Sequence, residues 1–438
     1  MPDHAAEYPR PMTYPEALAY LRDRQTGGAR FGLTATQALA ERCGHPERGL
    51  RFLHVAGTNG KGSVCAFLAA CLQAAGLRVG LYTSPHLVTV RERIQVDGEP
   101  ISPADFAARL SALRELLRPV PAAEQPTLFE LLTVLALTHF AAVGCEVVVW
   151  ETGLGGRLDA TNIVTPLAAI ITNVQADHEA WLGGSLERIA AEKAGIIKPG
   201  VPVFTAATEP TALRVLRAAA RARSAPFHQV TPGAPEDPAL AGRDLPLPGA
   251  HQRLNAGLAC ATLRALAPVL PVSAAALRTG LAAALWPGRL QVVVRPDGRG
   301  RILLDGAHNA AGAVALRAAL TDGFADARLT LVLGLLRDKD ATGICRELLP
   351  LAARVVLVPV AGRRGAAPAA LAAVCRDLLP GGPPPECADS LAAGLAATAT
   401  EPLVLVAGSL QLIGEALERL GVVPPPALDE RGLNDWTA

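Results

Sequence analysis

A glycine-rich run carries the clearest chemistry in this sequence. It reads Gly57-Thr58-Asn59-Gly60-Lys61-Gly62-Ser63 and follows the apolar stretch 51–56. Glycines let backbone N–H groups turn toward an anion, and a helix that begins here points its positive end at the same place. Lys61 can reach the outer phosphates. The run is therefore predicted to bind a nucleoside triphosphate; the alternative is a glycine-rich turn with an exposed lysine.

This loop departs from the standard phosphate loop, in which four residues separate the first glycine from Gly-Lys-Ser/Thr. Here two residues separate Gly57 from Gly60, and Gly62 stands between Lys61 and Ser63. The variant resembles the loop of the Mur ligase superfamily, and more narrowly that of folylpolyglutamate synthases and dihydrofolate synthases. The resemblance implies an enzyme that uses ATP to join L-glutamate to a carboxylate.

Polar residues follow three other apolar stretches, namely Ser84 after 78–82, Glu151 at the end of 147–151, and His178 after 167–173. Ligands collect at the carboxyl ends of parallel strands, so these side chains are expected beside the phosphate loop. A buried carboxylate is costly unless it faces a cation. The resemblance implies that Ser84, Glu151 and His178 hold two Mg²⁺ ions. A turn at Ser84 and a surface Asp177-His178 pair are the alternatives.

Lysine is rare, with only four among the 41 basic residues. This bias suggests that the lysines present supply chemistry that arginine cannot. Lys193 lies in Glu192-Lys193-Ala194-Gly195, where the resemblance implies a lysine carbamylated by carbon dioxide. A buried lysine with a lowered pKa can react as the free amine. The resemblance implies ATP, two Mg²⁺ ions and a carbamylated Lys193 as cofactors, with a monovalent cation as a further candidate.

The segment from Glu151 to Asn162 is the most family-specific part of the chain. The resemblance implies that Asp159 and Ala160 border a dihydropteroate pocket, and that Thr127 and Phe129 line it. Alternatively, Thr127 is only the N-cap of an apolar helix and Phe129 only a core residue. The sequence leaves dihydropteroate, a reduced folate or both open as the acceptor.

Four residues in the second half of the chain complete the expected site. Asn255 resembles an adenine contact, with a plain helix start as the alternative, and Arg289 is expected to reach phosphate. Asp305 and His308 match the family's Asp-x-Ala-His-Asn segment. The resemblance implies an acid at Asp305, which also contributes to the nucleotide site, and a base at His308.

The elements that must position these residues alternate between apolar strands and Ala/Leu-rich helices. This alternation predicts an α/β fold, with an N-terminal P-loop ATPase domain (1–288) built on a mostly parallel sheet and a smaller Rossmann-like C-terminal domain (289–438). Pro287-Gly288 breaks the preceding helix and marks the linker. Residues 208–247 are expected to be irregular, and the last dozen residues to be a frayed tail.

Composition excludes several classes of protein. A net charge of +1 with 18% charged residues offers no basic stripe for nucleic acid. The eight cysteines show no spacing typical of a disulfide framework or a zinc site. Polar residues interrupt the apolar stretch 131–150, which splits into a helix and a strand rather than a membrane span.

We therefore expect a cytoplasmic, monomeric enzyme that acts on small molecules, without nucleic acid or membrane as partners. Two alternatives remain, another amide ligase of the Mur superfamily or a nucleotide-gated binding module without ligase chemistry. A mere binding module would not need Glu151, His178 and Lys193 together.

Overall fold

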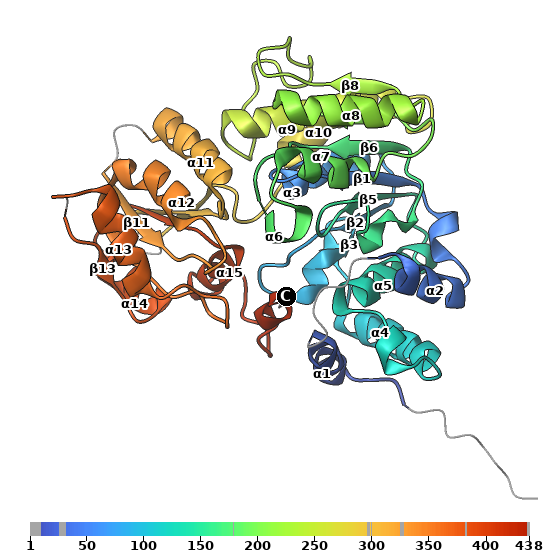
Figure 1. Cartoon of the computed structure of the whole chain (residues 1–438), viewed down its shortest axis with the longest axis horizontal. Helices are drawn as coiled ribbons and strands as arrows, with labels where there is room; N and C mark the ends of the chain where they lie inside the picture. Colours follow the sequence, from blue (N-terminus) through green and yellow to red (C-terminus); the bar gives the residue numbers. More distant parts are fainter. Residues whose placement is uncertain are drawn as a thin grey trace, which may run out of the picture.

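Two twisted sheets organise the chain, and each forms the centre of one lobe (Figure 1). The structure is a computed structural model, which describes residues 10–25, 32–177, 179–295, 298, 300–324, 328–381 and 383–435. Both sheets are mostly parallel and carry helices on both faces, so the predicted α/β class is confirmed.

The first sheet has eight strands, in the order β4 (Glu99–Pro100), β3 (Ile94–Val96), β2 (Val79–Tyr82), β5 (Val147–Glu151), β1 (Phe52–Ala56), β6 (Ala168–Ile171), β7 (Val203–Thr205) and β8 (Phe227–Gln229). The strands from β2 to β8 are parallel, and β3 and β4 are added antiparallel. In register, Val55 of the central strand lies opposite Glu151 on one side and Ile170 on the other. The polar groups that follow these strands therefore meet at one edge.

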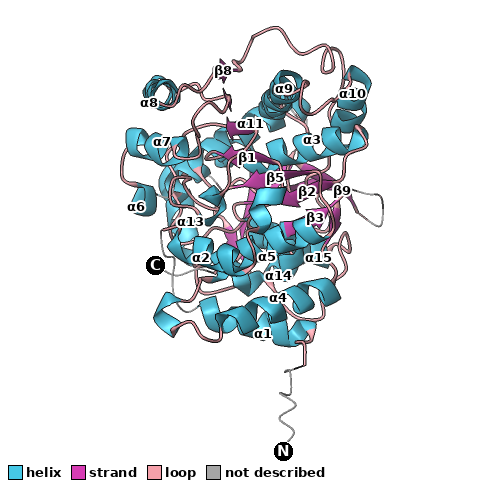
Figure 2. Cartoon of the chain, turned by 90° about the vertical axis from the view of Figure 1, so that its right-hand side faces the viewer, coloured by secondary structure: helices cyan, strands magenta, loops and turns pink. Residues whose placement is uncertain are grey.

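Helices cover both faces of this sheet (Figure 2). One face packs against α3 (Lys61–Ala74), α9 (Ala250–Ala265) and α10 (Ala274–Ala283). The other packs against α1 (Tyr14–Gln25), α2 (Thr34–Arg42), α4 (Pro103–Leu117), α5 (Leu128–Ala142), α6 (Glu179–Leu182), α7 (Leu186–Ala194) and α8 (Pro210–Ala222). Along β1, Leu53 and Val55 face the first group of helices, whereas Phe52 and Ala56 face the second.

The second sheet has six strands, in the order β13 (Glu386–Cys387), β12 (Ala352–Leu357), β11 (Leu329–Leu333), β14 (Leu403–Ala407), β10 (Arg301–Asp305) and β9 (Gln291–Val294). Among the strands that the structure describes in this sheet, only β9 runs antiparallel to its neighbour. Its helices are α11 (Ala310–Gly323), α12 (Ala341–Leu348) and α13 (Pro368–Leu378) on one face, with α14 (Leu391–Ala397) and α15 (Leu410–Arg419) on the other. The strands of the two sheets lie on either side of residue 288, and the domain boundary itself stays a prediction.

Two sequence expectations were wrong. Residues 210–222, expected to be irregular, form α8, because Pro210 suits the first turn of a helix and Ala212, Leu216 and Ala220 bury one face at four-residue spacing. The chain end was expected to fray, but residues 429–435 pack against the first lobe and include the short helix η6 (Arg431–Asn434). Buried hydrogen bonds to distant residues order this segment.

The apolar stretch 131–150 divides as predicted into α5 and β5. Among the helices in the described part of the chain, none is both long enough and apolar enough to span a membrane.

Helix α3, which begins at the phosphate loop, is backed closely by α10. A Cβ on Gly280 would lie 2.3 Å from the Cα of Cys71 on α3. We expect Gly280→Ala to force these helices apart and to destabilise the lobe by about 1–3 kcal/mol. Gly323→Ala is the matched control, because nothing lies within 4 Å of its Cβ position at the end of α11. Thermal unfolding of both variants checks this, and equal melting temperatures would contradict it.

Candidate active site

The phosphate loop joins β1 to α3 in a conformation that requires glycine. Gly60 has a φ of 81° and forms the N-cap of α3. A Cβ on Gly57 would lie 1.8 Å from the hydroxyl oxygen of Thr172. The glycines thus let the loop pass against the end of β6 while α3 directs its positive end into the loop.

Residues that follow β6 hold the loop in place. Thr172 donates from its hydroxyl to the carbonyl of Asn59 at 2.6 Å. Asn173 accepts from the backbone N–H of Thr58 at 3.1 Å through its carbonyl, and from that of Asn59 at 2.8 Å through its side chain. The loop is therefore shaped before any nucleotide binds.

A cavity of about 310 Å³ opens at this edge of the sheet and is lined from both lobes. The predicted site residues that line it are Gly57, Thr58, Asn59, Gly60, Lys61, Gly62, Ser84, Thr127, Phe129, Glu151, Asp159, Ala160, Lys193, Arg289 and His308. Residues separated by more than 200 positions in sequence thus meet around one space.

Two lysines converge on the same carbonyl. Lys61 donates to the carbonyl of Gly57 at 3.2 Å and to that of Thr58 at 3.3 Å. Lys193, from α7, donates to the carbonyl of Gly57 at 2.9 Å and is 3% exposed. Burial, followed by the charge of Lys61, lowers the pKa of Lys193 to about 7. A large fraction of Lys193 is therefore a neutral amine near neutral pH.

Glu151 ends β5 beneath the loop and is 3% exposed. Burial raises the pKa of its carboxyl to about 7, against the opposing charge of Lys61. The backbone N–H of Ser84 donates to it at 3.3 Å. The hydroxyl oxygen of Ser63 is also buried and has no hydrogen-bond partner in the described part of the chain.

These oxygen atoms are suited to a hard cation such as Mg²⁺. The third expected ligand, His178, lies outside the described residues. Within the described ranges, no three His, Cys, Asp or Glu side chains form a group that could hold a metal. The two-magnesium site therefore stays a prediction.

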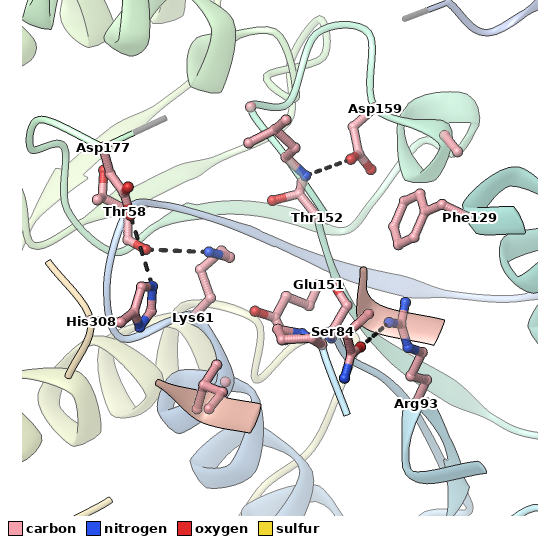
Figure 3. Close-up of a pocket in the computed structure, with 18 of the residues that line it drawn as sticks. Thr58, Lys61, Ser84, Arg93, Phe129, Glu151, Thr152, Asp159, Asp177 and His308 are labelled. Carbon is pink, nitrogen blue, oxygen red and sulfur yellow. Dashed lines mark hydrogen bonds and ion pairs between the residues drawn. The ribbon is translucent and has the colours of Figure 1, made fainter. Parts of the chain in front are cut away.

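The expected acceptor residues lie at the other end of the cavity, where Phe129 and Asp159 face the same space, away from Lys61 and His308 (Figure 3). Thr127 is the N-cap of α5 in a capping box with Glu130, and it also lines the cavity. Phe129 packs on the core, 6.1 Å from the ring of Tyr82, yet leaves part of its ring to the cavity. Thr127 and Phe129 thus each support the fold and also line the cavity.

Asp159 is fixed by backbone N–H donors. It accepts from Leu154 at 2.8 Å and from Thr161 at 3.0 Å, and it begins the short helix η4 (Ala160–Ile163). Burial nevertheless raises the pKa of its carboxyl. A ring nitrogen donor is a suitable partner for such a carboxylate.

Contacts between the lobes close the cavity on the phosphate side. Lys339 and Asp177 form a buried ion pair at 2.9 Å, and the amide of Asn309 donates to Asp177 at 2.9 Å. Asn309 and Asn59 exchange amide hydrogen bonds at 3.0 and 3.1 Å. These bonds join the second lobe directly to the phosphate loop.

His308 lies beside this network, its Nε2 3.9 Å from Asp177 and its Nδ1 2.7 Å from the carbonyl of Gly306. Burial, with the nearby charge of Lys339, lowers the pKa of His308 to about 4. The imidazole is therefore neutral near neutral pH.

Three expected site residues are not among the described residues that line the cavity, namely Ser63, Asn255 and Asp305. Asn255 supports the loop from behind, because a Cβ on Gly60 would lie 2.8 Å from its amide oxygen. Asp305 uses its oxygens to accept from the backbone N–H of Leu290 and of Ala307, both at 2.8 Å. It braces the joint between the lobes next to Arg289, and the expected proton transfer by Asp305 stays a prediction.

Several lining residues were not among the predicted site residues, namely Arg93, Lys339, Arg364, Ser409, Leu433 and Asn434. The scarcity of lysine could have pointed to Lys339. The others come from segments whose approach to the loop depends on how the lobes meet.

Comparisons with known proteins agree with the fold and the phosphate loop described above. Residues 55–224 match the Mur ligase middle domain, and residues 288–410 match the Mur ligase glutamate ligase domain. The dihydrofolate synthase/folylpolyglutamate synthase of Bacillus subtilis is 39% identical over 77% of this chain and 83% of its own length. The protein of the same name from Escherichia coli is 34% identical over 92% of this chain and 94% of its own.

The chain belongs to the dihydrofolate synthase/folylpolyglutamate synthase family of Mur ligases. Escherichia coli FolC in complex with DHPP and ADP superposes with a TM-score of 0.82 at 32% identity, covering 95% of this chain and 99% of that one. Mycobacterium tuberculosis folylpolyglutamate synthase complexed with ADP gives 0.84 at 31% identity, covering 94% and 100%. The chain is thus an ATP-dependent ligase of this family.

The raised pKa of Glu151 predicts that the ligand-free protein becomes less stable to unfolding as the pH rises. A folded-state pKa near 7 against an ordinary value near 4.5 means that stability from this carboxyl is present at low pH and lost as pH rises through 7. The free energy of unfolding of Glu151→Gln, relative to that of wild type, should therefore increase by about 2–3 kcal/mol between pH 5 and pH 8. Urea unfolding in the presence of a chelator measures this. A stability difference that does not vary with pH would show that Glu151 does not titrate in this range.

Proposed function

We propose that this ligase joins the amine of L-glutamate to the carboxylate of a pterin-bearing acceptor, either dihydropteroate or a reduced folate, through an acyl phosphate. The observation that carries the proposal is one cavity with a phosphate loop at one end and Phe129 and Asp159 at the other. Relatives named for dihydrofolate and folylpolyglutamate synthesis support it, as does the FolC complex with DHPP and ADP.

In the first step, an oxygen of the acceptor carboxylate attacks the γ-phosphorus of ATP, and ADP leaves. Lys61 and the N-terminal end of α3 offset the negative charge that develops on the transferred phosphoryl group. Arg289, which lines the cavity from the joint between the lobes, is assigned to the phosphates. We retain Asn255 as an adenine contact only as an expectation from the family.

Ser63, Ser84 and Glu151 would hold magnesium at this end of the cavity. The unpartnered hydroxyl of Ser63 and the buried carboxyl of Glu151 support this assignment. Bound magnesium would neutralise phosphate oxygens and orient them. His178 as a further ligand, a second magnesium ion and a monovalent cation rest on the family resemblance alone.

In the second step, the amine of glutamate attacks the acyl carbon, the amide bond forms and phosphate leaves. His308 is assigned to accept the proton that the amine loses, because burial keeps its imidazole neutral. Lys339 and the N-terminal end of α15 at Ser409 offer positive charge to the carboxylates of glutamate. Asp305 is assigned to positioning, since backbone N–H groups occupy both of its oxygens.

Closure of the lobes protects the intermediate. Because an acyl phosphate hydrolyses in water, the reaction needs a cavity that excludes solvent. The ion pair of Lys339 with Asp177 and the amide pair of Asn309 with Asn59 supply that closure. We retain a monomeric enzyme, with its lobes divided near residues 288 and 289, as an expectation.

Product formation with dihydropteroate and with tetrahydrofolate, each with ATP and L-glutamate, tests the proposal directly. Lys61→Ala should lower turnover about 10²–10³-fold without unfolding the protein, because it removes a charge that acts in the transition state. Lys198→Ala is the control, since Lys198 does not line the described cavity and donates to the carbonyl of Asn162. Glutamate-independent ATP hydrolysis with no amide product would refute ligation.

Lys193 is predicted to carry a carbamate, formed when its neutral amine attacks CO₂ and loses a proton. Because the pKa is about 7, the modified fraction should rise as pH increases from 6 to 8. Carbon-13 NMR with labelled bicarbonate should detect a signal that Lys198→Ala keeps and Lys193→Ala loses. Lys193→Ala should have very low activity, partly restored by a short added carboxylate. Full activity without rescue would contradict a role for the carbamate.

One site is predicted to serve both dihydrofolate synthesis and folate chain extension. Phe129→Leu keeps most of the core packing but removes the aromatic face. The kcat/KM for dihydropteroate should therefore fall about fivefold, which corresponds to about 1 kcal/mol. The kcat/KM for tetrahydrofolate should fall less, because the glutamate of this substrate makes additional polar contacts. Kinetics with both acceptors measure this. Wild-type enzyme that never uses dihydropteroate would leave a dedicated folylpolyglutamate synthase.

A further inference from the structure

The C-terminal segment 429–435, here called the strap, crosses from the second lobe back to the first. Figure 1 draws it in dark red between the lobes, close to α1. It follows α15 and the run Pro424-Pro425-Pro426, and it lies beyond the residues that match the glutamate ligase domain. Two strap residues, Leu433 and Asn434, nevertheless line the cavity.

Glu430 anchors the strap to the first lobe. Its side chain is 2% exposed and accepts hydrogen bonds from Tyr14 and Thr89 at 2.8 Å and from the backbone N–H of Val90 at 2.7 Å. All three donors bind the same oxygen, Oε2, of this buried carboxylate, so the contact is specific rather than adventitious.

Asn434 and His86 together hold the guanidinium of Arg93. Arg93 donates from Nη2 to the Oδ1 of Asn434 at 2.7 Å and from Nε to the Nδ1 of His86 at 2.9 Å. Asn434 returns a bond to the carbonyl of His86 at 2.9 Å, and the Nε2 of His86 lies 3.0 Å from the carbonyl of Glu430. Burial lowers the pKa of His86 well below its ordinary value. A neutral imidazole protonated on Nε2 satisfies all of these bonds.

These bonds leave the Nη1 of Arg93 without a protein hydrogen-bond partner in the described part of the chain. Arg93 lines the cavity, and Figure 3 shows its guanidinium directed toward the space between Glu151 and Phe129. Arg93 itself is only 5% exposed. A buried cation with a free donor in a ligand cavity calls for an oxygen of the ligand as its partner.

The two lobes also exchange apolar side chains around the strap. Leu433 packs in the core cluster of the first lobe, whereas Leu87 of the first lobe packs against a core cluster of the second. A Cβ on Gly414 of α15 would lie 2.0 Å from the carbonyl oxygen of Leu87. Asp435 accepts from Gln411 at 2.8 Å, which ties the strap back to α15. The orientation of Arg93 therefore depends on the closed arrangement of the lobes.

We propose that the strap is part of the acceptor site, where Asn434 is a positioning residue that directs the Nη1 of Arg93 toward an oxygen of the acceptor substrate. Leu433 completes the cavity wall beside it. This inference rests on the proposed function, and it adds that binding of the acceptor is coupled to lobe closure through the chain end.

Steady-state kinetics of Asn434→Ala test the proposal. The KM for the acceptor should rise about tenfold, because a hydrogen bond to a charged group is lost, while the KM values for ATP and glutamate stay within about twofold. Arg93→Lys should raise the acceptor KM similarly, since lysine cannot make the paired bonds. The double variant should be no worse than Arg93→Lys, because the two residues act as one unit.

Arg431→Ala is the matched control on the strap, since Arg431 pairs with Glu418 and Asp429 and does not line the described cavity. It should leave the acceptor KM unchanged. An unchanged acceptor KM in Asn434→Ala, an equal rise for all three substrates, or additive losses in the double variant would overturn the proposal. Wild-type enzyme that forms no amide product would instead overturn the proposed function.

Discussion

The bonds between the phosphate loop and the chain that follows β6 are the constraint on which the site depends. Thr172 and Asn173 occupy the polar groups of Thr58 and Asn59 and shape the loop before a ligand arrives. A nucleotide then meets an arranged set of N–H donors and need not order a free glycine segment, which would cost about 1–2 kcal/mol per residue. The side chain of Asn59 exchanges hydrogen bonds with that of Asn309, so the same short segment also helps to position the second lobe.

Burial sets the charge state of the groups that the loop gathers. Lys193 and His308 have lowered pKa values and Glu151 has a raised one, and in each case burial is the largest cause. Each group is thereby moved toward its neutral form, which suits the carbamylation that we propose for Lys193 and the proton acceptance that we propose for His308. At Glu151, burial instead disfavours the charged carboxylate, so a bound cation would have to offset that cost.

Lobe closure joins these groups into one site from three directions. The ion pair of Lys339 with Asp177 closes the phosphate side, and Asp305 braces the joint next to Arg289. Residues 429–435 close the side of the cavity that we propose for the acceptor. The ion pair and the contacts of residues 429–435 join the two lobes and would be lost if the lobes separated.

Local patterns of apolar and glycine residues were enough to predict the two-lobed α/β class, the phosphate loop and the residues at the ends of β1, β2 and β5. The sequence also pointed to Lys193 through the scarcity of lysine. Tertiary packing was needed to place the oxygens of Asp305 on the backbone N–H groups of Leu290 and Ala307 and the amide of Asn255 against Gly60. It was also needed to place Arg93 beside Asn434, which depends on how the two lobes meet. A contact between residues 341 positions apart leaves no trace in local periodicity.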